Sequence, residues 1–335
     1  MSAPRSAYVH IPFCHRRCFY CDFAVVPLGD RAGGESGPGS TSIATYLDQL
    51  LAEIALSPPG PPLATVYIGG GTPSLLTPAQ ISAVLESLRR QFGVQQGAEI
   101  TLEMDPASFD RSTLQALCRA GINRVSLGGQ SFDDTVLESL GRRHRRHDLQ
   151  QCALWLDQAL CEGMLRSWSL DLIRNLPAQT QSHWMAQLEQ ALAAKAPHLS
   201  IYDLAVEPGT VFAWRQRRGE LPLPDDDQAA AFTWDSKIGG LKRRVSRHER
   251  KIRLSTKVGE VVLEPPECLT EGVEGLELRI GYAENKLTDL VHNPVPLVDP
   301  DVGKPTHADG DRVEPLATAV DKSADLVEGC LGVGL

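Results

Sequence analysis

The feature that most constrains the fold is an alternation along the first 202 residues. Short apolar or β-branched runs alternate there with longer amphipathic stretches. Six runs read as strands: Tyr8–Ile11, Thr65–Ile68, Glu99–Met104, Arg124–Leu127, Ser169–Ile173 and Leu199–Tyr202. Helical patterns lie between them, as at Tyr46–Ala55, Thr77–Phe92, Asp110–Ala120 and Asp148–Glu162. A helix after nearly every strand requires right-handed crossovers. The sequence therefore predicts an α/β fold on a parallel sheet, either a barrel or an open doubly wound sheet.

The ends of several helices carry recognisable signals. Thr77 precedes a proline and Asp110 precedes an arginine, so both are predicted to cap helix N-termini. Gly163 follows the last of these helices and is predicted to end it. The stretch Pro27–Ser42 is rich in Gly, Ser and Pro, which predicts a loop.

Three of the eight cysteines are clustered within eight residues, at Cys14, Cys18 and Cys21. Such spacing favours metal or redox chemistry in a reducing compartment. Three thiolates can hold three irons of a [4Fe-4S] cluster, and a fully ligated cluster would need a fourth cysteine nearby. Phe23 stands where that fourth cysteine is often found. We therefore predict a cluster with one iron open to an external ligand.

A structural zinc site is the alternative reading of these cysteines. Zinc in such sites takes four ligands, and the sequence has no second CxxC pair. His10 and His15 are the near candidates for the missing ligand. The cluster is the favoured reading.

Charge and hydropathy exclude other classes of function. The formal net charge is −9, so no overall positive field exists to attract nucleic acid or an anionic membrane. No run of eighteen apolar residues is present, and the first fourteen residues lack a secretory pattern. We expect a soluble cytoplasmic protein with no transmembrane segment.

The spacing CxxxCxxC after a strand resembles the radical S-adenosylmethionine (SAM) superfamily. The preceding YVHIPFC, Tyr8–Cys14, resembles the oxygen-independent coproporphyrinogen III oxidase-like family. In the oxidase branch a further cysteine follows two residues after the third. Phe23 stands there instead, which is similar to the heme chaperone HemW branch. This position puts oxidase activity in doubt, and no residue is assigned as catalytic.

The resemblance implies a partial (β/α)6 radical SAM barrel and a set of residues that bind SAM. The family-like motifs GGGTPS, TLEMDP, GINRVSLGGQSF, LGRRH, SLDLI and LSIYDLAVEPGT follow in order and span about residues 8–232. The implied SAM contacts are Tyr8, Gly70, Gly71, Thr72, Glu103, Gln130, Arg142, Asp171 and Ala205.

Two positions depart from the family pattern. Gly129 stands where a valine is usual, and Asn175 where a glycine is usual. Asn is the best substitute for glycine if the backbone is left-handed there.

The resemblance also implies the chemistry and the partners. SAM would chelate the open iron, and one electron would cleave its sulfonium to methionine and a 5′-deoxyadenosyl radical. On the heme chaperone reading the chain binds heme and passes it to an acceptor protein. On the alternative reading it decarboxylates coproporphyrinogen III. The sequence identifies neither the heme ligand, the acceptor, the electron donor nor the oligomeric state, and leaves open whether the radical is used.

The resemblance stops near residue 235. We therefore predict a radical SAM core over residues 1–234 and an unrecognised, irregular or disordered carboxyl-terminal segment over 235–335. Within that segment Lys242–Arg253 is predicted to be a solvated face or linker rather than a binding patch, and Val258–Glu264 and Leu276–Ile280 are strand-like. A shifted reading frame and a genuine lineage-specific replacement both explain the change, and the first is favoured because the break falls within a helical pattern.

Overall fold

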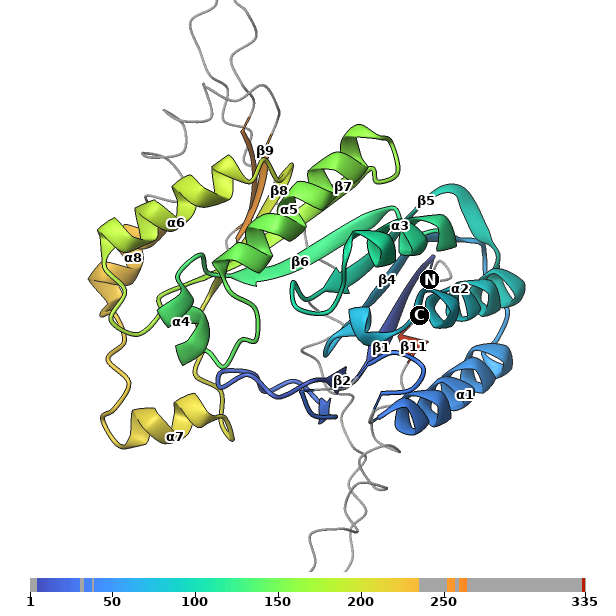
Figure 1. The fold of residues 1–335 in the computed structure, drawn as a ribbon, viewed down its shortest axis with the longest axis horizontal. Helices are drawn as coiled ribbons and strands as arrows, with labels where there is room; N and C mark the ends of the chain where they lie inside the picture. The colour runs from blue at the N-terminus through green and yellow to red at the C-terminus, as the bar shows by residue number, and fades with distance from the viewer. Residues whose placement is uncertain are drawn as a thin grey trace, which may run out of the picture.

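The computed structural model describes the backbone of residues 5–30, 33–37 and 39–234, and three short strands beyond them. Six parallel strands form the centre of its main sheet. They are β1 (Ser6–Ile11), β4 (Leu63–Gly70), β5 (Val94–Met104), β6 (Arg124–Gln130), β7 (Ser167–Arg174) and β8 (His198–Asp203). They lie side by side in chain order, as a partial (β/α)6 barrel requires (Figure 1). All six predicted strands are confirmed.

Helices follow the strands and cover one side of the sheet. The longer ones are α1 (Ser40–Leu56), α2 (Pro78–Phe92), α3 (Arg111–Ala120), α5 (Arg146–Cys161) and α6 (Gln181–Ala193). The shorter ones are α4 (Asp134–Ser139), α7 (Val211–Arg217) and α8 (Asp226–Trp234). Helix α1 contacts α2, α2 contacts α3, and α3 contacts α5. Because right-handed crossovers place successive helices on the same face, these helices form one continuous outer layer.

Helix α1 begins six residues before its predicted start at Tyr46. Ile43 is fully buried and continues the apolar face of the helix towards its N-terminus. The prediction missed this turn because its Ser and Thr residues are typical of loops. The four helices predicted from the sequence are otherwise confirmed.

The predicted caps are confirmed in their geometry. The Thr77 hydroxyl accepts from the backbone N–H of Gln80, and the Gln80 side chain accepts in return from the Thr77 N–H. The Asp110 carboxylate accepts from the N–H of Thr113. These bonds satisfy donors that the first helical turn leaves free.

The main core lies between the sheet and the outer helices. Side chains alternate along each strand, so Val66 and Ile68 are buried while Tyr67 points to the other face. Two tryptophans, Trp168 on β7 and Trp184 on α6, are fully buried in this core. The inner face carries polar groups instead, and these form the site described below.

Three short strands extend the sheet at its two edges. Strand β9 (Ile252–Thr256) pairs in parallel with β8, and β10 (Gly259–Leu263) pairs antiparallel with β9. Strand β11 (Val333–Gly334) pairs antiparallel with β1 at the opposite edge. The strand-like run at 258–264 is confirmed by β10, and Ile252 and Arg253 of the predicted linker belong to β9.

Other predictions for the carboxyl-terminal segment lie outside the described residues, among them the strand at 276–280 and most of the basic run. The division at residue 235 stays a prediction. None of the described helices has the length and hydropathy that crossing a bilayer would require.

Candidate functional site

A cavity of about 410 Å³ opens at the carboxyl ends of the parallel strands. This is the edge of an α/β sheet at which ligands gather. Its lining includes all three clustered cysteines and eight of the nine predicted SAM contacts, which are Gly70, Gly71, Thr72, Glu103, Gln130, Arg142, Asp171 and Ala205. Residues from strands far apart in the chain therefore meet in one place.

The three cysteines lie on a loop that crosses the mouth of the barrel. We call residues 14–21 the cluster loop. It follows β2 (Phe13–Cys14), which pairs with β3 (Val26–Pro27), and it is the dark blue segment below the sheet in Figure 1. The Leu28 N–H donates to the Cys14 carbonyl at 2.8 Å, and the Cys21 N–H donates to the Cys18 carbonyl at 3.3 Å. These bonds fix the loop at both ends.

Two of the cysteine sulfurs have donors from other parts of the chain. The Thr72 hydroxyl lies 3.5 Å from Cys14 Sγ, and Arg142 Nη1 lies 3.7 Å from Cys18 Sγ. Burial and the neighbouring thiols raise the pKa of Cys14 to about 11. Coordination to iron deprotonates a thiol outright, and hydrogen bonds to the sulfurs tune such clusters.

The donor set fits a four-iron cluster better than a single metal ion. Within the residues that the structure describes, no three His, Cys, Asp or Glu side chains are placed to hold one ion. A [4Fe-4S] cluster takes one ligand at each of several separate irons, so its thiolates need not converge on a point. The geometry therefore gives no support to the zinc alternative.

The glycine-rich turn after β4 lies directly against the cluster loop. A Cβ atom on Gly71 would lie 2.7 Å from the Phe13 carbonyl oxygen and 2.9 Å from Cys14 Sγ. Gly70 has a φ of +117° and packs against the His10 ring. Any side chain at Gly71 would push the cluster loop away, so the approach of the two backbones requires glycine.

Glu103 is a half-buried carboxyl group at the end of β5. Its Oε1 accepts from the Tyr67 hydroxyl at 2.7 Å, and its Oε2 accepts from the Gly70 N–H at 3.0 Å. Burial raises its pKa to about 7, with a further contribution from the charge of Asp171. A cationic ligand in the cavity would relieve both effects.

Asp171 on β7 has one oxygen satisfied and one without a partner. Its Oδ2 accepts from the Ser126 hydroxyl at 2.8 Å. Its Oδ1 is buried and has no hydrogen-bond partner among the described residues. Burial raises the pKa of this carboxyl group. A buried acceptor of this kind needs a donor, and the amino and hydroxyl groups of SAM are suitable ones.

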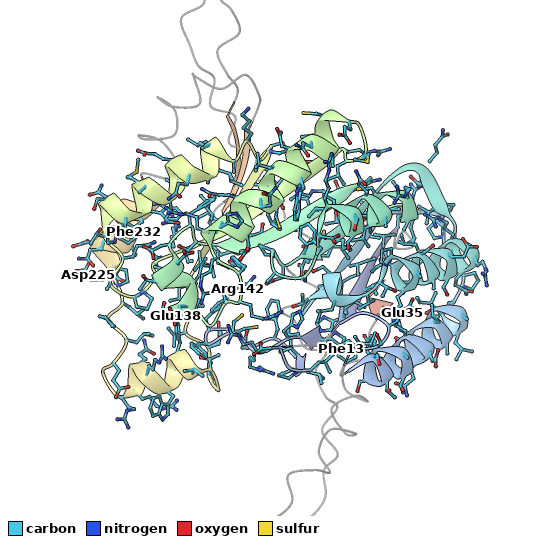
Figure 2. The ribbon with its side chains drawn as sticks, in the orientation of Figure 1. Phe13, Glu35, Glu138, Arg142, Asp225 and Phe232 are labelled. Atoms are coloured by element: carbon cyan, nitrogen blue, oxygen red, sulfur yellow. The ribbon has the colours of Figure 1, made fainter. Side chains whose placement is uncertain are left out.

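Arg142 connects the cavity wall to the cluster loop. Its guanidinium forms an ion pair with Asp105 at 2.5 Å and donates to the Gly128 carbonyl at 2.9 Å. Figure 2 shows its side chain beside α4, on the side of the sheet where the cluster loop runs. Sequence analysis missed Asp105. The signal was its position two residues after Glu103, which places both at one end of β5.

The other predicted positions vary in their relation to the cavity. Gln130 lines it from an irregularity in β6 and has a φ of +62°. Asn175 has a φ of +61°, which confirms the left-handed backbone inferred for that position. Tyr8 is not part of the cavity wall: its hydroxyl lies 3.0 Å from His10 Nδ1, and its ring stacks on Tyr67. Its contact with SAM stays a prediction.

Sequence analysis also missed residues of the wall at the end of β8 and in the cluster loop. Tyr20, Tyr202 and Asp203 line the cavity. Asp203 forms an ion pair with the buried Arg174 and accepts from the Asn175 amide at 3.0 Å. The sequence signal for Asp203 was an acidic residue directly after the predicted strand Leu199–Tyr202.

The sequence is similar to known proteins over the same region. Residues 8–168 match the radical SAM superfamily. Over 230 residues the chain is 42% identical to the heme chaperone HemW of Synechocystis, an alignment covering 68% of this chain and 54% of that protein. It is 37% identical over 227 residues to the heme chaperone HemW of Escherichia coli, covering 67% of this chain and 56% of the relative. The chain thus spans little more than half the length of these relatives.

A solved structure shares the fold. Coproporphyrinogen III oxidase (HemN) from Escherichia coli superposes with a TM-score of 0.59 at 24% identity, covering 78% of this chain and 65% of that one.

Proposed function

This chain belongs to the radical SAM superfamily, and on that premise we propose that it is a HemW-like heme chaperone with a SAM-binding [4Fe-4S] core. Cys14, Cys18 and Cys21 would hold the cluster. Gly70, Gly71, Thr72, Glu103, Gln130, Arg142, Asp171 and Ala205 would surround SAM, and Tyr8 is a further proposed contact. When bound, the two cofactors together supply one-electron chemistry at the sulfonium of SAM.

The observation that carries this proposal is the meeting of thiols and carboxyl groups in one cavity. The cysteines lie at one wall, and Glu103 and Asp171 lie on the strand ends. SAM carries an ammonium and a sulfonium group as well as a ribose, so two half-buried carboxyl groups with an unsatisfied oxygen suit it. The chain's own residues bind and orient the ligand, and the barrel shields it from water.

We propose the carrier function rather than the oxidase because of Phe23 and the sequence relatives. Phe23 lies at the cavity wall with 56% of its surface exposed, in the place where an oxidase-type sequence has a cysteine. Three relatives, with 36, 37 and 42% identity, are named heme chaperones. Heme and an acceptor protein are therefore the proposed partners.

The proposed compartment is the cytoplasm. Cys14, Cys18 and Cys21 are free thiols, and they require a reducing environment to bind iron.

Anaerobic reconstitution with iron and sulfide tests the core. We expect about four irons per chain and broad visible absorption in the wild type, both lost when all three clustered cysteines are changed to alanine. A full cluster in that triple variant would refute the cysteine assignment.

Two further titrations separate the carrier from the oxidase. Hemin added to the reconstituted chain is expected to give a saturable shift in the heme absorbance. Reductant, SAM and coproporphyrinogen III are expected to leave the porphyrinogen unchanged. Failure to bind heme, or appearance of protoporphyrinogen, would overturn the carrier function.

A further inference from the structure

Phe19, between the second and third clustered cysteines, is held on all sides by parts of the chain distant in sequence. Its N–H donates to the Leu140 carbonyl at 3.0 Å, and its carbonyl accepts from the Phe212 N–H at 3.0 Å. One face of its ring contacts Gly141, where an added Cβ would lie 3.2 Å from the ring. The Arg215 guanidinium lies 5.1 Å from the ring centroid.

Helix α7 supplies two of these four contacts. Phe212 is almost completely buried and donates its N–H to the loop, and Arg215 on the same helix lies over the rings of both Phe19 and Phe212. The helix itself is capped by the Thr210 hydroxyl, which accepts from the Ala213 N–H. In Figure 1 α7 lies below α4, at one end of the cluster loop.

A separate small core lies under this contact. It consists of the buried residues Leu140, Ile173, Leu176, Phe212 and Leu221, with Phe19 and Tyr20 packed against it. This core is distinct from the main core between the sheet and the outer helices. The position of the loop that bears Cys18 and Cys21 therefore depends on α7 rather than on the barrel alone.

We propose that Arg215 and Phe212 are positioning residues of the cluster loop: α7 holds Phe19 so that Cys18 and Cys21 keep the separation that a [4Fe-4S] cluster needs. The inference rests on the proposed cluster. It assigns a role to a segment that lies beyond the residues matching the superfamily, which end at 168. A cation over an aromatic ring is favourable, and its loss would let the loop sample positions in which the cluster is more easily attacked.

The test measures iron loss from reconstituted full-length protein to an excess of the chelator bathophenanthroline, followed by absorbance under anaerobic conditions. We expect Arg215→Ala to lose iron about threefold faster or more than the wild type, and Arg215→Lys, which keeps a cation over the ring, to lie between them. The electron paramagnetic resonance line shape of the reduced cluster is expected to broaden in Arg215→Ala.

Arg218→Ala is the matched control, because Arg218 lies over Trp214, 4.6 Å from its ring centroid, just beyond the same helix. It is expected to behave as the wild type. Equal rates of iron loss in the wild type, Arg215→Ala and Arg218→Ala would overturn the positioning role.

Two further results distinguish failure of the cluster assignment from failure of the variant to fold. If the wild type binds no cluster, the proposed function fails and the inference falls with it. If Arg215→Ala does not fold, as judged by far-ultraviolet circular dichroism before reconstitution, Arg215→Met decides, since it keeps the aliphatic stem and removes the charge. Faster iron loss in Arg215→Met supports the role, and a wild-type rate refutes it.

Discussion

Asp171 and Glu103 are both half-buried, but only Asp171 has a carboxylate oxygen without a hydrogen-bond donor in the described part of the chain. Both oxygens of Glu103 accept hydrogen bonds from the chain, whereas Asp171 has one buried oxygen without a partner among the described residues. A buried acceptor without a donor is costly, and the cost is recovered when a ligand supplies the donor. Asp171 is therefore the residue whose contribution depends most on the bound ligand.

Changing Asp171 to asparagine tests this directly. The neutral amide keeps the size of the side chain and loses the charge, so we expect the Kd for SAM to rise roughly ten-fold to a hundred-fold. Isothermal titration of SAM into the reconstituted protein measures the change. Asp48→Asn, an exposed change on α1, is the control and is expected to leave the Kd unaltered. An unchanged Kd in Asp171→Asn would remove this residue from the SAM site.

Glu103 makes the stability of the cofactor-free chain depend on pH. Its pKa in the folded state is about 7, above the ordinary 4.5, so between those values the folded state binds more protons than the unfolded state. The contribution of Glu103 to stability is then greatest below pH 4.5 and falls as the pH rises to 7. The difference is on the order of 3 kcal/mol.

Urea unfolding at several pH values from 5 to 7.5 measures this slope. Glu103→Gln is expected to lose it, while the exposed change Glu86→Gln on α2 is expected to keep it. Parallel curves for the wild type and Glu103→Gln would show that another group is responsible.

At the scale of single elements, β6 and its neighbours illustrate how this chain differs from its family. Gly129 stands where a valine is usual, and the space of that side chain is filled from two other elements. An added Cβ would lie 2.6 Å from Leu170 Cδ1 on β7 and 3.1 Å from Leu149 Cδ1 on α5. The side chains of Leu170 and Leu149 therefore fill the space that a side chain at position 129 would need.

We expect Gly129→Val alone to destabilise the chain by about 1–3 kcal/mol, since it overpacks a filled core. Gly129→Val combined with Leu170→Val is expected to recover part of this loss, because the second change removes the closest atom. Thermal unfolding of the two single variants and the double variant gives the coupling. Strictly additive effects would mean that the two side chains do not compete for the same space.

The elements also show what sequence reasoning could and could not reach. The strands and helices were predictable because periodicity and capping are local signals. That the three clustered cysteines lie close together was predictable because they belong to one short loop. The ion pair of Arg142 with Asp105 was not, since it joins residues 37 positions apart. The contact of α7 with Phe19 was missed for the same reason: nothing near either residue in the sequence reports it.

The placement of Tyr8 shows what a motif leaves open. The resemblance implies a contact with SAM, which stays a prediction, and the structure shows its hydroxyl beside His10 and its ring stacked on Tyr67. A motif fixes a position in the chain, and the rotamer of the side chain depends on neighbours that the motif does not include.

At the scale of the whole molecule, the sheet continues past the barrel strands on both edges. Strand β8 would present an open edge over residues 198–201 if β9 did not pair with it. Open edges of this kind promote association between chains, and their pairing or covering prevents it. Strands β9, β10 and β11, which lie beyond residue 234, therefore belong to the same sheet as the candidate site.

Shortened chains test this dependence. A chain ending at residue 264 keeps β9 and β10, and a chain ending at 234 lacks both. Both lack β11, so a difference between them reports on the β8 edge alone. We expect the shorter chain to associate and to unfold at lower urea concentration, because the backbone groups of β8 lose their partners. Light scattering and urea titration measure the two effects, and identical behaviour of the two chains would show that β9 and β10 do not protect the edge.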